Sequence, residues 1–188
     1  MTIKLNKKQK IKVLNGEDVF SIMQEVLMRE SKINRNKEHL WTIALSQNNN
    51  ILLIELVTLG MNAVHVEPVD IFSFMLQKRA VKMILVHNHP SGELEPSTGD
   101  IEMTDVMQSI GTFLQLPLAD HLIISERGFF SFMESGLLGK IVRESTYDLS
   151  FAKTNKLLEE IKTQGSIIEQ LKDKLEKMQK DNSRKNKR

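Results

Sequence analysis

The chain has 188 residues and a formal net charge of +2; 40% of its residues are hydrophobic, 27% are charged and none is cysteine. This composition is typical of a soluble globular protein and excludes a bilayer-spanning segment, disulfides and thiolate metal sites, so only histidine and carboxylate side chains could hold a metal ion. The basic N-terminus lacks the apolar segment of a secretory signal, and we expect a cytoplasmic protein without membrane contact.

The first part of the chain predicts a helix followed by a hairpin. Residues 16–29 place apolar side chains at the three-and-four spacing of an amphipathic helix. Strand-like runs follow at residues 41–45 and 51–57, and the cluster Asn48-Asn49-Asn50 between them is typical of a turn. Glu55 lies inside the second run. Because a buried carboxylate without a partner is costly, we expect Glu55 to lie at a sheet edge or to face a cation.

The next segment predicts a crossover connection and a second hairpin. Pro68 suits the first turn of a helix that leads to an apolar strand at residues 83–86, and strand, helix, strand implies a crossover in one sheet. Residues 97–114 predict a further helix, and residues 120–125 and 128–132 predict a closing hairpin. We therefore expect an α/β (α+β) fold with a mixed β-sheet flanked by helices.

The C-terminal segment has a different character. Residues 151–188 contain 11 Lys and Arg against 6 Asp and Glu, a balance of +5, which leaves −3 for the rest of the chain. A seam with alternating spacings of four and three predicts a short helical, coiled-coil segment formed by Leu157, Ile161, Gln164, Ile168, Leu171, Leu175 and Met178. The seam could pair two chains into a homodimer or lie against its own domain. We expect a domain over residues 1–145, a helical extension over 146–179 and a basic disordered tail over 180–188.

The densest set of reactive side chains follows the strand at 83–86. The string His-Asn-His-Pro-Ser-Gly starts at His87, and Ser97 and Asp100 come after it. Residues two apart on a strand point to the same face, so His87 and His89 can reach one ion. Two neutral imidazoles and the Asp100 carboxylate leave a fourth position for water, which is the donor set of a catalytic zinc site. Ser97 and Asp100 also have the spacing of a helix-capping box, and the two roles can coexist.

These residues resemble the signature of a known superfamily. A glutamate followed by His-x-His, seven residues and Ser-x-x-Asp is similar to the JAB/MPN metalloprotease (JAMM) motif, and the fuller string with Asp120-His121-Leu122-Ile123-Ile124 looks like its RadC branch. The resemblance covers roughly residues 15–140 and implies a cytidine-deaminase-like, JAB/MPN-type sheet. The chain departs from the RadC pattern at residues 58–60 and 67–69, and we expect it to lack the helix-hairpin-helix module usual in full-length RadC proteins.

The resemblance implies a zinc metallopeptidase. The Zn²⁺ ligands it implies are His87, His89 and Asp100. Glu55 would act as general base and acid through the metal-bound water, and Ser97 would steady the tetrahedral intermediate. Members with this motif hydrolyse peptide or isopeptide bonds, so we expect a peptide or protein substrate.

Two other interpretations remain open. In the first, the domain is an accessory binding module that holds its metal structurally, while the basic tail makes weak contact with nucleic acid, in line with the association of the RadC name with DNA repair. In the second, the chain is an assembly protein whose helical extension dimerises it or recruits a partner helix.

The remaining histidines carry weaker signals. We expect His39 and His65 on the surface. His121 follows Asp120 at the start of a predicted strand, and we expect it to form a structural hydrogen bond, with a carboxylate–histidine contact behind the metal as the alternative.

Overall fold

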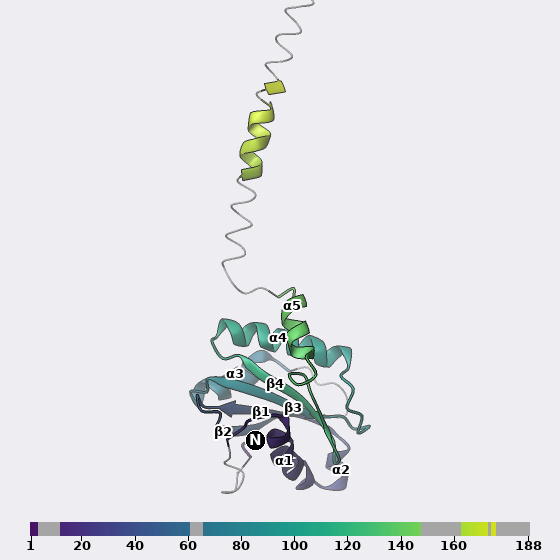
Figure 1. The fold of residues 1–188 in the computed structure, drawn as a ribbon. Coiled ribbons are helices and arrows are strands. Elements are labelled where there is room, and N and C mark those ends of the chain that lie inside the picture. The colour runs from purple at the N-terminus through teal and green to yellow at the C-terminus, as the bar shows by residue number, and fades with distance from the viewer. Residues whose placement is uncertain (4–11, 61–65, 148–162, 173, 176–188) are drawn as a thin grey trace, which may run out of the picture. The chain divides into compact units, whose positions relative to one another are not determined.

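The computed structural model describes residues 1–3, 12–60, 66–147, 163–172 and 174–175. The chain divides into two compact units, Met1–Tyr147 and Asp148–Arg188. The first unit contains one five-stranded sheet with helices on both of its faces (Figure 1). The mixed sheet with flanking helices confirms the predicted fold class.

The strand order of the sheet is β2-β1-β3-β4-β5. β1 (Glu38–Leu45) lies between β2 (Ile51–Gly60) and β3 (Lys82–Asn88) and is antiparallel to both. β4 (Leu118–Ile124) is parallel to β3, and β5 (Phe129–Ser131) is antiparallel to β4. β2 and β3 therefore run in the same direction on either side of β1, as the predicted crossover requires.

Helices cover the two faces of the sheet unequally (Figure 1). One face packs against α1 (Gly16–Met28), and we call it the α1 face. The opposite face packs against α3 (Pro68–Gln77), α4 (Thr98–Phe113) and α5 (Leu137–Glu144), and we call it the α4 face. A single turn, α2 (Lys32–Arg35), precedes β1.

Side chains alternate along β3 between these two faces. Ile84 and Val86 belong to the apolar core of the α1 face, whereas Met83 and Leu85 belong to the core of the α4 face. The same alternation directs His87 to the α4 face, at the carboxyl end of the strand, where α4 begins.

The predicted elements are present with shifted ends. The helix predicted over residues 16–29 is α1, and the predicted hairpin is β1 and β2. Pairing in this hairpin continues outward to Glu38 and Gly60, so the strands are longer than their apolar runs. The short helices α2 and α5 were not predicted; α5 is amphipathic and buries Leu138 and Ile141.

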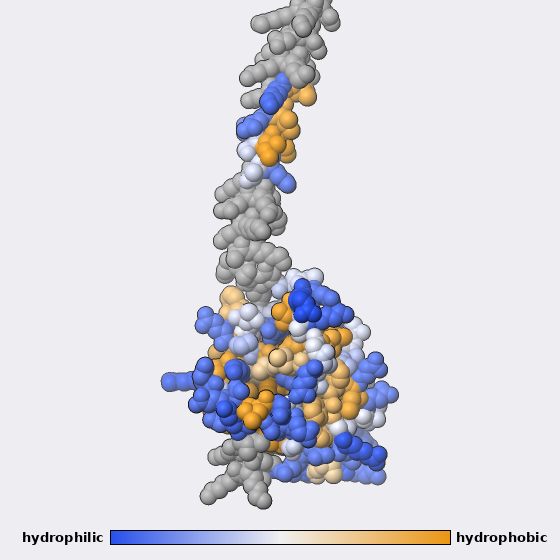
Figure 2. Space-filling view, in the orientation of Figure 1, coloured by the Kyte–Doolittle hydropathy of each residue, from blue (hydrophilic) through white to orange (hydrophobic). Residues whose placement is uncertain are grey.

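The second unit is helical over residues 163–172 and at 174–175. Its apolar side chains gather along one side of the helix (Figure 2), and Ile168, Leu171 and Leu175 are 54%, 58% and 60% exposed. The predicted tail at 180–188 and three seam residues, Leu157, Ile161 and Met178, lie outside the described residues. No helix in the described part of the chain is long and apolar enough to cross a bilayer.

Candidate metal centre

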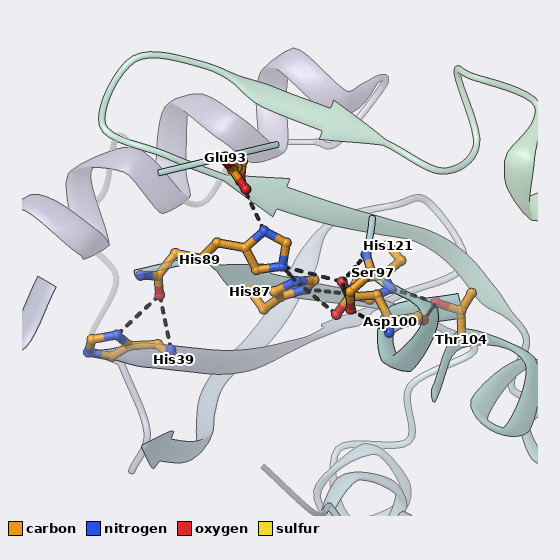
Figure 3. Close-up of polar contacts among 9 residues, drawn as sticks. His39, His87, His89, Glu93, Ser97, Asp100, Thr104 and His121 are labelled. Atoms are coloured by element: carbon orange, nitrogen blue, oxygen red, sulfur yellow. Dashed lines mark hydrogen bonds and ion pairs between the residues drawn. The ribbon is translucent and has the colours of Figure 1, made fainter. Parts of the chain in front are cut away.

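The three predicted metal ligands meet where β3 ends and α4 begins (Figure 3). His87 is the penultimate residue of β3, His89 follows the strand, and Asp100 lies in the first turn of α4. One ligand atom from each lies within 4.8 Å of those of the other two. His87 and Asp100 are buried and His89 is half-buried. This group could hold a metal ion.

The distances within the group fit a tetrahedral ion. His87 Nε2 lies 3.0 Å from His89 Nε2 and 3.1 Å from Asp100 Oδ1, and His89 Nε2 lies 3.3 Å from Asp100 Oδ2. Ligand atoms at zinc bond lengths of about 2.0–2.1 Å are about 3.3 Å apart in a tetrahedron. Two nitrogens and one oxygen are also a donor set that zinc commonly takes. The residues present therefore fit Zn²⁺ in both chemistry and spacing.

A tight turn orients the ring of His89. The backbone N–H of Gly92 donates to the carbonyl of His89 over 2.9 Å, and Gly92 has a φ of 77°, which glycine adopts without a Cβ penalty. The turn brings the carbonyl of Glu93 to 3.0 Å from His89 Nδ1. Because a carbonyl only accepts, Nδ1 of His89 donates, and its Nε2 faces the centre.

Ser97 and Asp100 form the predicted capping box at the start of α4. The backbone N–H of Asp100 donates to Ser97 Oγ over 3.2 Å, and the backbone N–H of Ser97 donates to Asp100 Oδ2 over 2.8 Å. The Ser97 hydroxyl also donates to Asp100 Oδ2 over 2.6 Å. Its proton is therefore directed at the carboxylate of Asp100, which fixes the orientation of that ligand.

The charges of the group are coupled. Burial opposes the charge of Asp100, but hydrogen bonds with His87 and His89 outweigh it, so the pKa of Asp100 lies well below its ordinary value. The hydrogen bond with Asp100 raises the pKa of His89, although burial acts in the opposite direction. A metal ion and a proton compete for the same nitrogen of His89, so metal uptake becomes more favourable as pH rises.

Glu55 lies elsewhere on the sheet. It is 4% exposed, and its Oε1 lies 2.5 Å from the amino group of Met1, since residues 1–3 run along the free edge of β2. Glu55 is opposite Thr42 and His87 is opposite Leu40, so two strand spacings and two residues separate Glu55 from His87. That is about 12 Å between Cα atoms. Glu55 thus lies at a sheet edge and faces a cation, as expected, but the cation is the N-terminal amino group.

Glu38 is the carboxylate that lies beside the His–Asp group. It begins β1, and the pairing of His39 with Asn88 places it opposite the position of His89. Its charge adds to the effect of Asp100 on the pKa of His89. A pocket on the α4 face is lined by Glu38, Leu40, Thr58, Val66, His87 and Met103. Sequence reasoning missed Glu38 because the predicted strand began three residues later, although an acid at the start of a strand was the available signal.

His39 and Asn88 lie on the α1 face and connect the start of β1 to β3. His39 is 1% exposed and its ring stacks on Trp41 at a centroid distance of 4.9 Å, so the expected surface position is wrong. Asn88 Oδ1 accepts from the backbone N–H of His39 over 3.0 Å, and Asn88 Nδ2 donates to the carbonyl of Lys37 over 3.0 Å. These two bonds bracket Glu38 and hold it at its place beside β3.

His121 contacts the candidate centre from β4. Its Nε2 lies 2.8 Å from His87 Nδ1, and its Nδ1 lies 2.7 Å from Thr104 Oγ1. Asp120 instead accepts a hydrogen bond from the backbone N–H of His121 over 2.7 Å. Burial lowers the pKa of His121, and the neighbouring His87 acts in the same direction. His65 lies outside the described residues.

Comparisons with known proteins relate this chain to one family. The profile of the RadC-like JAB domain matches residues 13–137, which include every strand of the sheet and the His–Asp group. A UPF0758 protein of Pelodictyon phaeoclathratiforme is 41% identical over 128 residues, 68% of this chain and 55% of the relative. UPF0758 proteins of Chlorobaculum tepidum and Methanosarcina barkeri are 38% and 37% identical over 129 and 130 residues, 68% and 69% of this chain and 56% and 55% of the relatives. The match therefore spans little more than half the length of these relatives.

Proposed function

The chain belongs to the family of RadC-like JAB domains, and from that membership we propose that it is a metal-dependent hydrolase of JAMM type that cleaves a peptide or isopeptide bond. One observation carries the proposal. The ring nitrogens of His87 and His89 and the carboxylate of Asp100 converge at distances of 3.0–3.3 Å, which suit a tetrahedral divalent ion.

The ion we propose is Zn²⁺, held by His87, His89 and Asp100. When bound, it would supply Lewis acidity and lower the pKa of a coordinated water molecule to about 7, so that a nucleophile would be available at neutral pH. Ser97 holds the Asp100 carboxylate in the orientation that this site needs. The stabilisation of a tetrahedral intermediate by Ser97 remains part of the proposal, and it requires the Ser97 hydroxyl to redirect its single proton from Asp100 to the substrate oxygen.

Glu38 is the group we propose for proton transfer. Its place in the pocket with His87 supports this role, because a general base must reach the water that attacks the substrate. Glu38 would take a proton from that water and pass it to the nitrogen of the leaving amine. Leu40, Val66 and Met103 make the rest of the pocket largely apolar, and this favours an apolar substrate side chain beside the scissile bond.

A matched pair of variants tests whether Glu38 or Glu55 transfers the proton. Glu38→Gln and Glu55→Gln each replace one carboxylate by an amide of the same shape. On a peptide library with zinc-loaded protein, we expect Glu38→Gln to keep its zinc and lose about 100- to 10,000-fold in kcat. Glu55→Gln should keep its turnover.

The opposite pattern would assign proton transfer to Glu55. A zinc-loaded wild-type chain that cleaves no peptide or isopeptide in such libraries would contradict the hydrolase itself.

We also propose that the second unit self-associates through its helix. Ile168, Leu171 and Leu175 lie three and four residues apart and are all more than half exposed, which is typical of an unpaired coiled-coil seam. Sedimentation of the full chain beside a chain that ends at Glu144 tests this. A dimer is expected only for the full chain, and a monomer in both cases would contradict the proposal.

A further inference from the structure

A chain of three hydrogen bonds connects two candidate metal ligands through residues behind the site (Figure 3). His87 Nδ1 lies 2.8 Å from His121 Nε2, and His121 Nδ1 lies 2.7 Å from Thr104 Oγ1. The Thr104 hydroxyl donates to the backbone carbonyl of Asp100 over 2.5 Å. We call this chain the His121 relay. It joins β3, β4 and the first turns of α4, and its polar atoms are shielded from water, since His121 and Thr104 are both 0% exposed.

The direction of every bond in the relay follows from its last member. A carbonyl oxygen can only accept, so the hydroxyl proton of Thr104 points to Asp100. Thr104 Oγ1 must then accept from His121, which places a proton on Nδ1 of His121. A second proton on this fully buried ring would leave a cation with no carboxylate as its hydrogen-bond partner in the relay, at a high desolvation cost. His121 Nε2 is therefore free to accept, and Nδ1 of His87 donates to it.

We propose that His121 is a positioning residue that holds His87 in the tautomer with a free Nε2 for the metal ion, and that Thr104 sets the tautomer of His121. The inference rests on the proposed metal site and adds two residues that do not contact the ion. His87 with a proton on Nδ1 can present a lone pair to the ion only at Nε2, which is the nitrogen that faces His89 and Asp100.

A comparison of the two histidine ligands explains why Thr104 is needed. His89 donates through Nδ1 to the carbonyl of Glu93, and a carbonyl has one possible role. His121 can either donate or accept at Nε2, so its role depends on what binds its other nitrogen. Phe132 stacks on the ring at a centroid distance of 4.6 Å and holds its plane, but only Thr104 decides which nitrogen carries the proton.

The tautomer can be measured directly in the wild-type protein. In ¹⁵N-labelled, zinc-loaded full chain, long-range ¹H–¹⁵N correlation spectra distinguish protonated from unprotonated ring nitrogens. We expect a proton on Nδ1 and none on Nε2 of His121, together with a proton on Nδ1 of His87. A proton on Nε2 of His121 would overturn the inference, whatever the variants do.

Two matched pairs of variants test the consequence for metal binding, with Zn²⁺ alone as the probe. His121→Leu removes the acceptor, whereas His121→Gln offers an amide oxygen to His87 and an amide N–H to Thr104. Thr104→Val removes the hydroxyl, whereas Thr104→Ser keeps it. Loss of such a supporting hydrogen bond typically weakens metal binding about 10- to 100-fold. We expect this loss in His121→Leu and Thr104→Val, and binding within a few-fold of wild type in His121→Gln and Thr104→Ser.

The outcomes separate this inference from the proposed function. A wild-type chain that binds no zinc overturns both. Normal wild-type binding with equal affinities in His121→Leu and His121→Gln, or in Thr104→Val and Thr104→Ser, overturns only the relay. Thermal unfolding of the metal-free variants identifies a variant that fails to fold, and the other pair and the spectra then decide.

Discussion

The two faces of the sheet both bury polar side chains near strand ends, but these side chains have different partners. On the α1 face, Asn88 bonds to backbone groups of the segment before β1, and Asp120 accepts from the backbone N–H groups of His121 and Met133. On the α4 face, the donor atoms of His87, His89 and Asp100 face one another instead.

This difference separates structural polar groups from ligand-binding ones. A buried polar group that bonds to the backbone is satisfied by the fold itself. Nitrogen and oxygen atoms that converge on one point are satisfied best by a cation at that point. Substitution of the polar side chains on the α1 face should therefore change stability without changing metal binding. Substitution of His87, His89 or Asp100 on the α4 face should weaken metal binding more than it changes the stability of the metal-free chain.

The largest expected effect is the loss of metal binding in His89→Ala. Zinc at 100 times its Kd should stabilise the wild type by about 2.7 kcal/mol, because it binds the folded chain only. His89 is half-buried, so its truncation should cost little stability in the metal-free chain. Urea unfolding with and without zinc measures both quantities. A zinc-dependent shift of wild-type size in His89→Ala would break the proposed contrast between the faces.

Asn88→Ala should have the next largest effect, and on stability alone. It leaves the buried backbone N–H of His39 without its acceptor, and a buried unpaired polar group costs about 1–3 kcal/mol. The zinc content should remain that of the wild type. If Asn88→Ala loses zinc but keeps its urea midpoint, the division between the faces is wrong.

Ser97→Ala should fall between the two classes, since Ser97 both caps α4 and bonds to a ligand. Loss of the cap should cost about 1 kcal/mol in the free energy of unfolding. Zinc affinity should also fall, because Asp100 loses the hydroxyl that orients it. Ser97→Thr keeps the hydroxyl and is the control. A drop in stability with unchanged zinc affinity would restrict Ser97 to the cap.

The smallest expected effect is the pH dependence of the contribution that Asp120 makes to the free energy of unfolding. Burial raises the pKa of Asp120 above 3.8, although hydrogen bonds from Ser131 and Met133 oppose the shift. Below 3.8 both folded and unfolded chains carry the proton, and Asp120 contributes nothing. As pH rises from there to the folded pKa, the unfolded chain releases the proton first, so this residue's contribution to stability decreases and then stays constant.

Asp120→Asn removes that titration. The difference in unfolding free energy between variant and wild type should therefore change with pH only in the window from about 4 up to the folded pKa. Urea unfolding of both proteins at pH values from about 3 to about 8 measures this difference. A difference that is constant over the whole range would show that the pKa of Asp120 is the same in the folded and unfolded chains.

Local spacing made the grouping of the three candidate metal ligands predictable, because one strand, one turn and one helix start carry all three within residues 87–100. Glu38 and His121 come from β1 and β4, and only the register of the sheet brings them to the site. Thr104 lies one helical turn after Asp100 in α4, but its role depends on His121. Glu55 looked like the exceptional acid in its strand. Its partner is the amino group of Met1, and no local pattern predicts that residues 1–3 pair with β2.

The most direct test of the account is a zinc-edge anomalous difference map from crystals of the zinc-loaded full chain. We predict a peak bonded to Nε2 of His87, Nε2 of His89 and the carboxylate of Asp100, with Glu38 beside it. Loaded crystals in which these atoms are ordered but the peak is absent would contradict the metal centre and the function proposed from it.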